Sequence, residues 1–113
     1  MYQFSLWMAE LPFLEDSCVL RGLHPVIIVS NDINNAHNQV VTVVPLTTNT
    51  KRLDIPTRVL IRGQGLRYDS VAVCDQIMPL DKSRLSYQIG YLNNDYDRYA
   101  LLQGIATQLG VSA

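Results

Sequence analysis

Polar side chains that can transfer protons or bind anions stand at the ends of apolar stretches in this sequence. They are His24, Thr47, Thr48, Asn49, Asp75 and Gln76. An imidazole changes its charge near neutral pH, and a hydroxyl can donate a hydrogen bond to a phosphate oxygen. A carboxylate and an amide within an apolar strand need hydrogen-bond partners, because burial without partners is costly. These residues therefore either form a polar site at strand ends or only satisfy the backbone of nearby loops.

The basic residues are unevenly distributed, although the net charge is only −1. Five of the nine fall between positions 51 and 67, namely Lys51, Arg52, Arg58, Arg62 and Arg67. Only Asp54 offsets them before Asp69. A near-neutral chain lacks the overall basic charge of many nucleic-acid binders. The cluster is therefore either a solvated face or a local edge that contacts phosphates.

Several catalytic signatures are missing from the sequence, which contains no GxSxG, no P-loop and no HExxH. The ten carboxylates form no tight cluster of the kind that two-metal nucleases use, so we expect any nuclease chemistry to be metal-independent. Cys18, Cys74 and two scattered histidines do not match a zinc site. We expect neither a metal nor a cofactor.

Length and composition indicate one globular domain that spans residues 1–113. The chain is 48% hydrophobic and 17% charged, which is typical of a folded protein with one modest core. Its apolar runs are far shorter than the roughly 20 residues that span a bilayer. The N-terminal stretch MYQFSLWMAE lacks the basic and apolar regions of a signal peptide. We therefore expect a cytoplasmic protein with no membrane partner.

The hydrophobic pattern predicts several short strands followed by one long helix. The strands are expected over residues 2–11, 25–30, 40–47, 57–62, 70–80 and 86–92, with a short turn at 81–85. Unbroken β-branched residues at 25–30 and 40–47 indicate strands buried on both faces. Short strands followed by one helix favour an α+β fold: a small, mostly antiparallel β-barrel or half-barrel with the C-terminal helix packed on it.

The helix is predicted to begin near one of three capping residues, Asn93, Asn94 or Asp95, and to end at Gly110. Its apolar residues recur at the spacing of one helix face. The predicted core-facing stripe consists of Tyr99, Leu102, Ile105, Ala106 and Leu109.

Five short motifs follow one another in a characteristic order along the chain. They occupy residues 22–25, 45–48, 56–57, 75–76 and 81–85, and read GLHP, PLTT, PT, DQ and DKSRL. In this order and at this spacing they resemble the MazF/PemK family of bacterial toxins. The resemblance extends from about residue 6 into the C-terminal helix, which is nearly the whole chain.

The resemblance implies a fold, an activity and partners. The fold is a small SH3-like barrel with a C-terminal helix, usually a homodimer. The activity is that of a type II toxin–antitoxin toxin, an mRNA interferase that cuts single-stranded RNA at short motifs without a metal. In that chemistry the 2′-hydroxyl attacks the adjacent phosphate while a base takes its proton and an acid protonates the 5′-oxygen. The cognate antitoxin binds the toxin and blocks the RNA groove.

The resemblance also assigns roles to residues. Thr47 matches the threonine at the scissile phosphate, and Asp75 matches an acid that serves in chemistry or in shaping the site. With His24 and Arg21 they make up the predicted catalytic set. The predicted RNA-contacting residues are Ser17, Thr48, Asn49, Lys51, Arg52 and Gln76.

The chain departs from the family pattern at two positions. Family members commonly have arginine directly before the proline, where this chain has His24, and a second branch has arginine where this chain has Val73. Arginine is always charged and binds phosphate with two N–H groups, whereas histidine is charged only part of the time. Three alternatives follow: His24 replaces the arginine as acid or base, Arg21 supplies the phosphate-binding charge, or the chain is a weakened or inactive homologue.

Two functions of another class stay open at this point. An inactive homologue would act by binding antitoxin. Alternatively, the chain would poison DNA gyrase, because the barrel that it resembles is shared with a family of toxins that do so. The roles of the aromatic residues are equally open, because each either stacks on RNA bases or lines a dimer interface. These residues are Tyr2, Trp7, Tyr87 and Tyr91.

Overall fold

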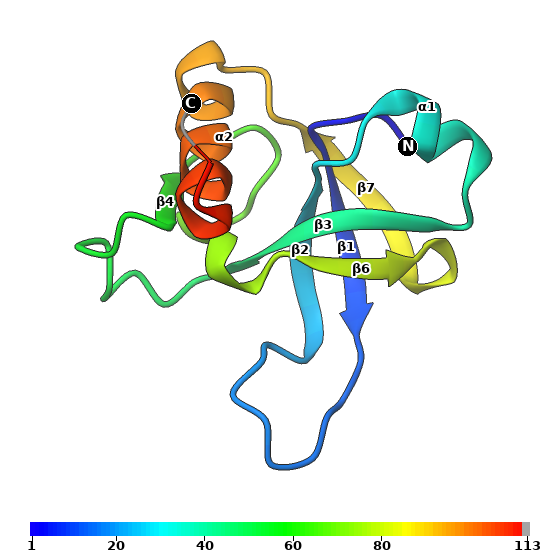
Figure 1. Cartoon of the computed structure of the whole chain (residues 1–113), viewed down its shortest axis with the longest axis horizontal. Coiled ribbons are helices and arrows are strands. Elements are labelled where there is room, and N and C mark those ends of the chain that lie inside the picture. Colours follow the sequence, from blue (N-terminus) through cyan, green and yellow to red (C-terminus); the bar gives the residue numbers. More distant parts are fainter. Residues whose placement is uncertain (112–113) are drawn as a thin grey trace.

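A curled antiparallel sheet of seven strands carries one long helix (Figure 1). The computed structural model describes residues 1–111. The strands are β1 (Ser5–Leu11), β2 (Gly22–Ile28), β3 (Val40–Thr47), β4 (Arg58–Ile61), β5 (Ser70–Val73), β6 (Met78–Asp81) and β7 (Leu85–Tyr91). The helices are α1 (Asp32–His37) and α2 (Asp95–Leu109), with two 3-10 turns, η1 (Cys74–Gln76) and η2 (Lys82–Arg84).

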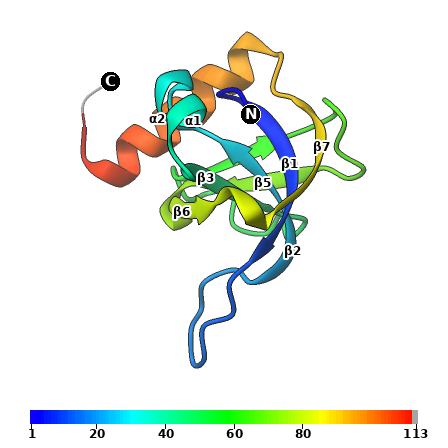
Figure 2. The same ribbon diagram turned by 90° about the vertical axis from the view of Figure 1, so that its right-hand side faces the viewer.

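Strand β3 connects the two halves of the barrel. The strand order is β4-β5-β3-β2-β1-β7, and β6 also pairs with β3. The start of β3 pairs with β6 and its end, Leu46 and Thr47, pairs with β5. The sheet curls into a half-open barrel (Figures 1 and 2), and within residues 1–111 no ladder joins its edge strands β4 and β7. The predicted α+β, mostly antiparallel fold with a C-terminal helix is confirmed, with the barrel open at one seam.

The two strands with unbroken β-branched sequences are buried on both faces, as predicted. Ile27 of β2 and Val44 and Leu46 of β3 belong to the core under α2. The alternate residues Val26 and Val41 belong to a second core on the other face. Side chains of a strand alternate between faces, so each of these strands contributes to both cores and stays out of water.

The predicted strand over 70–80 is wrong in one respect, because a 3-10 turn divides it into two strands. β5 pairs with the end of β3 and β6 with its start, and η1 lies between them at Cys74–Gln76. The polar residues Asp75 and Gln76 leave the ladder at this point and form hydrogen bonds elsewhere. The connection at 31–39, predicted as turns, contains the short helix α1, capped by the Asn31 side chain.

Helix α2 begins after Asn94 and ends at Gly110, as predicted, but it packs on the sheet through a different face. Leu101 and Gly104 are buried, whereas Tyr99, Leu102 and Leu109 are 63%, 45% and 61% exposed. The face is set by Gly104, where an added Cβ would lie 2.8 Å from Cys74 Sγ. The predicted stripe was therefore wrong for Tyr99, Leu102 and Leu109, whereas Ile105 packs against the core as predicted. Within residues 1–111, neither helix has the length and apolar character needed to cross a membrane.

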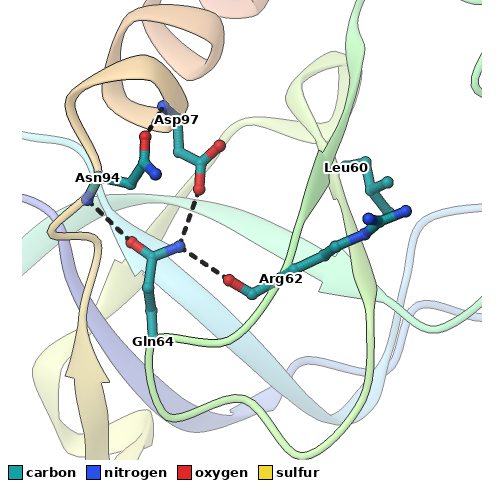
Figure 3. A pocket seen from close by; sticks show the side chains of 5 residues that line it. All are labelled: Leu60, Arg62, Gln64, Asn94 and Asp97. Carbon is teal, nitrogen blue, oxygen red and sulfur yellow. Dashed lines mark hydrogen bonds between the residues drawn. The ribbon is translucent and has the colours of Figure 1, made fainter.

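The loop between β4 and β5 is fixed to the rest of the barrel at two points. Figure 3 shows the Gln64 side chain held between the loop and the start of α2. Its Oε1 accepts from the backbone N–H groups of Asn93 (2.7 Å) and Asn94 (3.2 Å), and its Nε2 donates to Asp97 Oδ2 (2.9 Å). A Cβ on the next residue, Gly65, would lie 2.5 Å from the Ile89 carbonyl oxygen of β7. The loop backbone therefore lies directly against β7.

The packing of this loop predicts different effects for two glycine substitutions. Gly63→Ala and Gly65→Ala both place a Cβ on left-handed backbone (φ +67° and +99°), which costs about 1–2 kcal/mol. Only Gly65→Ala adds a clash with β7 backbone, worth roughly 1–3 kcal/mol more. Chemical denaturation should give a clearly lower free energy of unfolding for Gly65→Ala than for the matched Gly63→Ala control. Equal losses would contradict the close packing of loop and strand.

Candidate active site

An arginine–aspartate pair joins the first residue of β4 to the turn η1. Arg58 Nε donates to Asp75 Oδ1 at 2.8 Å, and Arg58 Nη2 donates to Asp75 Oδ2 at 3.1 Å. The Thr57 hydroxyl donates to the same carboxylate at 3.3 Å. The Arg58 and Asp75 side chains are 22% and 31% exposed. The pair is bidentate, and two simultaneous N–H···O bonds fix the orientation of the guanidinium plane.

The pair changes the acid–base properties of its members. The hydrogen bonds from Arg58 lower the pKa of Asp75, and burial opposes this only in part. The bond to Asp75 raises the pKa of Arg58. Burial raises the pKa of the neighbouring Cys74 thiol to about 12, and the charge of Asp75 adds to the effect. Asp75 is therefore a carboxylate and Cys74 a neutral thiol near neutral pH.

A small cavity of about 120 Å³ lies beside this pair, where β3 ends. It is lined by Leu20, Thr47, Asn49, Arg52, Arg58, Val73 and Gln76. Gln76 Oε1 accepts a hydrogen bond from the Leu20 backbone N–H at 2.7 Å, which ties the β1–β2 loop to the cavity rim. The cavity thus combines a hydroxyl, two amides and two guanidinium groups, which is a set suited to bind a phosphate diester.

His24 lies in β2, next to the end of β3. Its Nδ1 is 3.0 Å from the backbone oxygen of Leu46, the residue before Thr47. A carbonyl oxygen only accepts, so Nδ1 carries the proton in this bond and the neutral ring keeps Nε2 as an unprotonated acceptor. His24 is half-buried and is absent from the residues that line the cavity, but its backbone contact places it beside Thr47. The ring is thereby oriented with one nitrogen available.

The structure brings together some of the predicted site residues and separates others. Thr47, Asn49, Arg52 and Gln76 line one cavity; Asp75 binds Arg58 of the same lining, and His24 contacts the residue before Thr47. Thr48 lines a different hollow. Lys51 is exposed in the loop after β3.

Ser17 and Arg21 lie in the β1–β2 loop, which extends away from the barrel at the bottom of Figure 1. The Arg21 guanidinium carbon is 4.7 Å from the centroid of the Phe13 ring, so this cation packs against an aromatic ring of its own loop. The Ser17 hydroxyl accepts from the Val19 backbone N–H at 3.1 Å. The predicted site roles of both residues stay predictions.

Arg58 was missed as a site residue, although it belongs to the basic cluster. Its cross-strand partner in the β4–β5 ladder is Val73, the position where one family branch has arginine. Arg58 thus stands directly across the ladder from the position two residues before the Asp-Gln pair. The position of Arg58 follows from the register of β4 and β5, which the sequence does not show directly. The only signal in the sequence was that Arg58 follows the Pro-Thr motif at residues 56–57.

The pair predicts a pH-dependent contribution to stability. The folded-state pKa of Asp75 lies below its unfolded value of about 3.9, so the stabilisation is complete above that pH and is lost as the pH falls through the folded value. Arg58→Met should lower the free energy of unfolding at pH 7 by about 1–3 kcal/mol, since it leaves a half-buried carboxylate without its charged partner. The deficit should shrink in acid. Denaturation at several pH values and carboxyl NMR titration of Asp75 measure both effects.

The exposed Arg52–Asp54 pair provides the matched control. Its atoms lie 3.2 Å apart, but its side chains are 63% and 70% exposed. Arg52→Met should leave the free energy of unfolding nearly unchanged, because solvent screens an exposed pair. Equal effects of the two substitutions, or an unchanged pKa of Asp75 in Arg58→Met, would contradict the role given to the Arg58–Asp75 pair.

Comparisons with known proteins agree with this architecture. A curated relative, the endoribonuclease MazF of Staphylococcus saprophyticus, is 36% identical over 92 residues, covering 80% of this chain and 76% of that protein. The Mycobacterium tuberculosis toxin MazF-mt6 superposes with a TM-score of 0.79 at 26% identity, over 96% of this chain and 99% of that one. A mycobacterial endoribonuclease, solved in complex with its cognate antitoxin, superposes with a TM-score of 0.80 at 26% identity, over 100% of this chain and 98% of that one.

The family model for the PemK-like, MazF-like toxin of type II toxin–antitoxin systems matches residues 2–107. The match includes every strand, both helices up to Thr107 and all the residues of the cavity. Sequence, fold and relatives agree, and the chain belongs to the family of PemK-like, MazF-like toxins of type II toxin–antitoxin systems.

Proposed function

We propose that this protein is a toxin that cleaves single-stranded RNA without a metal. One observation carries the proposal: Thr47, Arg52 and Arg58 line a single cavity at the end of β3, beside His24. The similarity to an endoribonuclease at 36% identity supports the same reaction class. A cavity with two guanidinium groups and a hydroxyl binds the charged diester that joins two nucleotides.

The proposed reaction forms a bond from the 2′-oxygen to phosphorus and breaks the bond from phosphorus to the 5′-oxygen. His24 Nε2 takes the proton of the 2′-hydroxyl, and the imidazolium so formed is the acid that can return it to the 5′-oxygen. The Thr47 hydroxyl donates to a non-bridging oxygen. Arg58 uses two of its N–H groups on Asp75 and directs the others at the charge that develops on the phosphorane.

Asp75 has a positioning role in this scheme. Its lowered pKa keeps it ionised near neutral pH, so it has no proton to give to a leaving group. Its two hydrogen bonds fix the guanidinium plane of Arg58 instead. Arg58 thereby supplies a cation in a chain that has histidine at position 24 and valine at position 73.

We infer the partners and the compartment from the same family membership. A structural neighbour was solved with its cognate antitoxin, which supports an antitoxin partner for this chain. We further propose that the toxin is a homodimer and acts in the cytoplasm, where its RNA substrate is found. The antitoxin would prevent cleavage by covering the RNA site.

Purified protein should cut single-stranded RNA in the presence of EDTA, and single substitutions in the site should slow it. Removing a proton-transfer group or a charge-stabilising donor costs about 10²-fold or more in such sites, so His24→Ala, Thr47→Val and Arg58→Met should each lose at least that much. Arg84→Met, an exposed arginine outside the cavity, is the matched control. Rates are measured with end-labelled RNA, and circular dichroism checks folding.

The RNA assay, followed by a gyrase assay and an antitoxin-binding assay, separates the competing functions. Intact RNA with folded wild-type protein would contradict the nuclease proposal. Blocked supercoiling in a gyrase assay would then indicate a gyrase poison, and tight antitoxin binding without either activity would indicate a titrating homologue. Full activity of His24→Ala would remove the base role from His24, and full activity of Arg58→Met would remove the cation role from Arg58.

A further inference from the structure

The Pro-Thr motif at residues 56–57 comes directly before Arg58, the cation of the proposed site. β4 begins only at Arg58, so Thr57 belongs to the turn that leads into the strand. Neighbouring side chains within a strand point to opposite faces of the sheet. Because Thr57 precedes the strand, its side chain and that of Arg58 both reach the Asp75 carboxylate. The motif thus places a second hydrogen-bond donor at the carboxylate that holds Arg58.

Thr57 is buried and binds the turn η1 through two of its groups. Its backbone carbonyl oxygen accepts from the Cys74 N–H at 2.9 Å. Its hydroxyl donates to Asp75 Oδ1 at 3.3 Å. The backbone contact holds the two segments together, and the χ1 angle of a β-branched side chain is restricted. The Thr57 hydroxyl is therefore kept next to the carboxylate.

The Arg58 contacts alone leave the plane of the Asp75 carboxylate free to turn. The last torsion of an aspartate side chain is broad, so a carboxylate and its bidentate guanidinium can rotate together as one unit. Arg58 Nε and Thr57 Oγ1 both donate to Oδ1, whereas Arg58 Nη2 donates to Oδ2. A donor from a separate, buried residue restricts the rotation of this unit. The direction of the remaining Arg58 N–H groups therefore depends on Thr57 as well as on Asp75.

We propose that Thr57 is a positioning residue for RNA cleavage, whose hydroxyl sets the plane of the Asp75 carboxylate and through it the direction of the Arg58 guanidinium. The inference rests on the proposed function, because the scissile phosphate is the group at which Arg58 is directed. Thr57 is not among the residues that line the cavity, whereas Arg58 is. Thr57 therefore acts through the Asp75–Arg58 pair and not by touching RNA.

Replacing Thr57 by valine tests the hydroxyl alone, because valine keeps the shape of the side chain. Thr57→Val should lower kcat for RNA cleavage in EDTA about tenfold or more, with little change in KM, since a misdirected guanidinium stabilises the transition state less. Thr57→Ser keeps the hydroxyl and should restore most of the lost rate. Ser5→Ala, which removes a buried hydroxyl that donates to the Tyr2 backbone oxygen, should leave kcat unchanged.

A double substitution shows whether Thr57 acts through Arg58. In an Arg58→Met background, Thr57→Val should cause no further loss of kcat, because residues that act through one another are not additive. An unchanged kcat in Thr57→Val would overturn the positioning role and leave the nuclease proposal intact, and so would a full additional loss in the Arg58→Met background. Equal losses in the valine and serine variants would also overturn it, since they would assign the effect to packing.

NMR of the free protein tests the same contact without RNA. The hydrogen bond from Thr57 helps to lower the pKa of Asp75, so Thr57→Val should raise that pKa and speed the exchange of the Arg58 Nε–H with water. Ser5→Ala should change neither quantity, and denaturation checks the folding of each variant. If Thr57→Val does not fold, Thr57→Ala is compared with Thr57→Ser instead.

The NMR result also decides the inference if the nuclease proposal fails. Intact RNA with folded wild-type protein would contradict the nuclease alone. A raised Asp75 pKa and faster Arg58 exchange in Thr57→Val would then still support Thr57 as the residue that positions Arg58. An unchanged pKa and an unchanged exchange rate would overturn the inference whether or not RNA is cut.

Discussion

The 3-10 turn η1 is the point on which the proposed active site depends. Its three consecutive side chains hold three different parts of the chain. Cys74 is buried against α2, where its Sγ lies 3.9 Å from the Leu101 carbonyl oxygen. Asp75 binds Arg58 at the start of β4, and Gln76 binds the backbone of Leu20 in the β1–β2 loop. The cavity is lined by Arg58, Gln76 and Leu20, so it lies where β4, η1 and the β1–β2 loop meet. The sequence pattern predicted one continuous strand over 70–80, and the turn that interrupts this strand places Gln76 at the cavity.

The charge of the site follows from strand register. The cation that the family often places before the proline is absent at His24, and the alternative position holds Val73. Because Arg58 stands across the ladder from Val73, a guanidinium still reaches the cavity from β4. In the proposed mechanism His24, whose Nδ1 is held by the Leu46 backbone oxygen, has a separate task, the transfer of a proton. The division of charge stabilisation and proton transfer between two residues suits the chemistry of each group.

Much of the fold could be predicted because local patterns determine it. The β-branched runs of β2 and β3 need burial on both faces. Asn94 caps the start of α2 and Gly110 caps its end, both through local hydrogen bonds. The buried face of α2 was only partly predicted: Ile105 packs on the core as expected, but Gly104 at the centre of the face has no side chain to mark it. Arg58 was missed for a similar reason: its partner Asp75 lies 17 residues away, and only the pairing of β4 with β5 brings the two together.

The chemical identity of the new RNA ends tests the central claim most directly. Wild-type protein is incubated in EDTA with an RNA that it cuts, and the fragments are analysed by mass spectrometry. Attack by the 2′-hydroxyl predicts a 2′,3′-cyclic phosphate on one fragment and a 5′-hydroxyl on the other, and no cut where that single ribose is replaced by deoxyribose. A 3′-hydroxyl with a 5′-phosphate, or continued cutting at the deoxyribose position, would contradict the proposed mechanism.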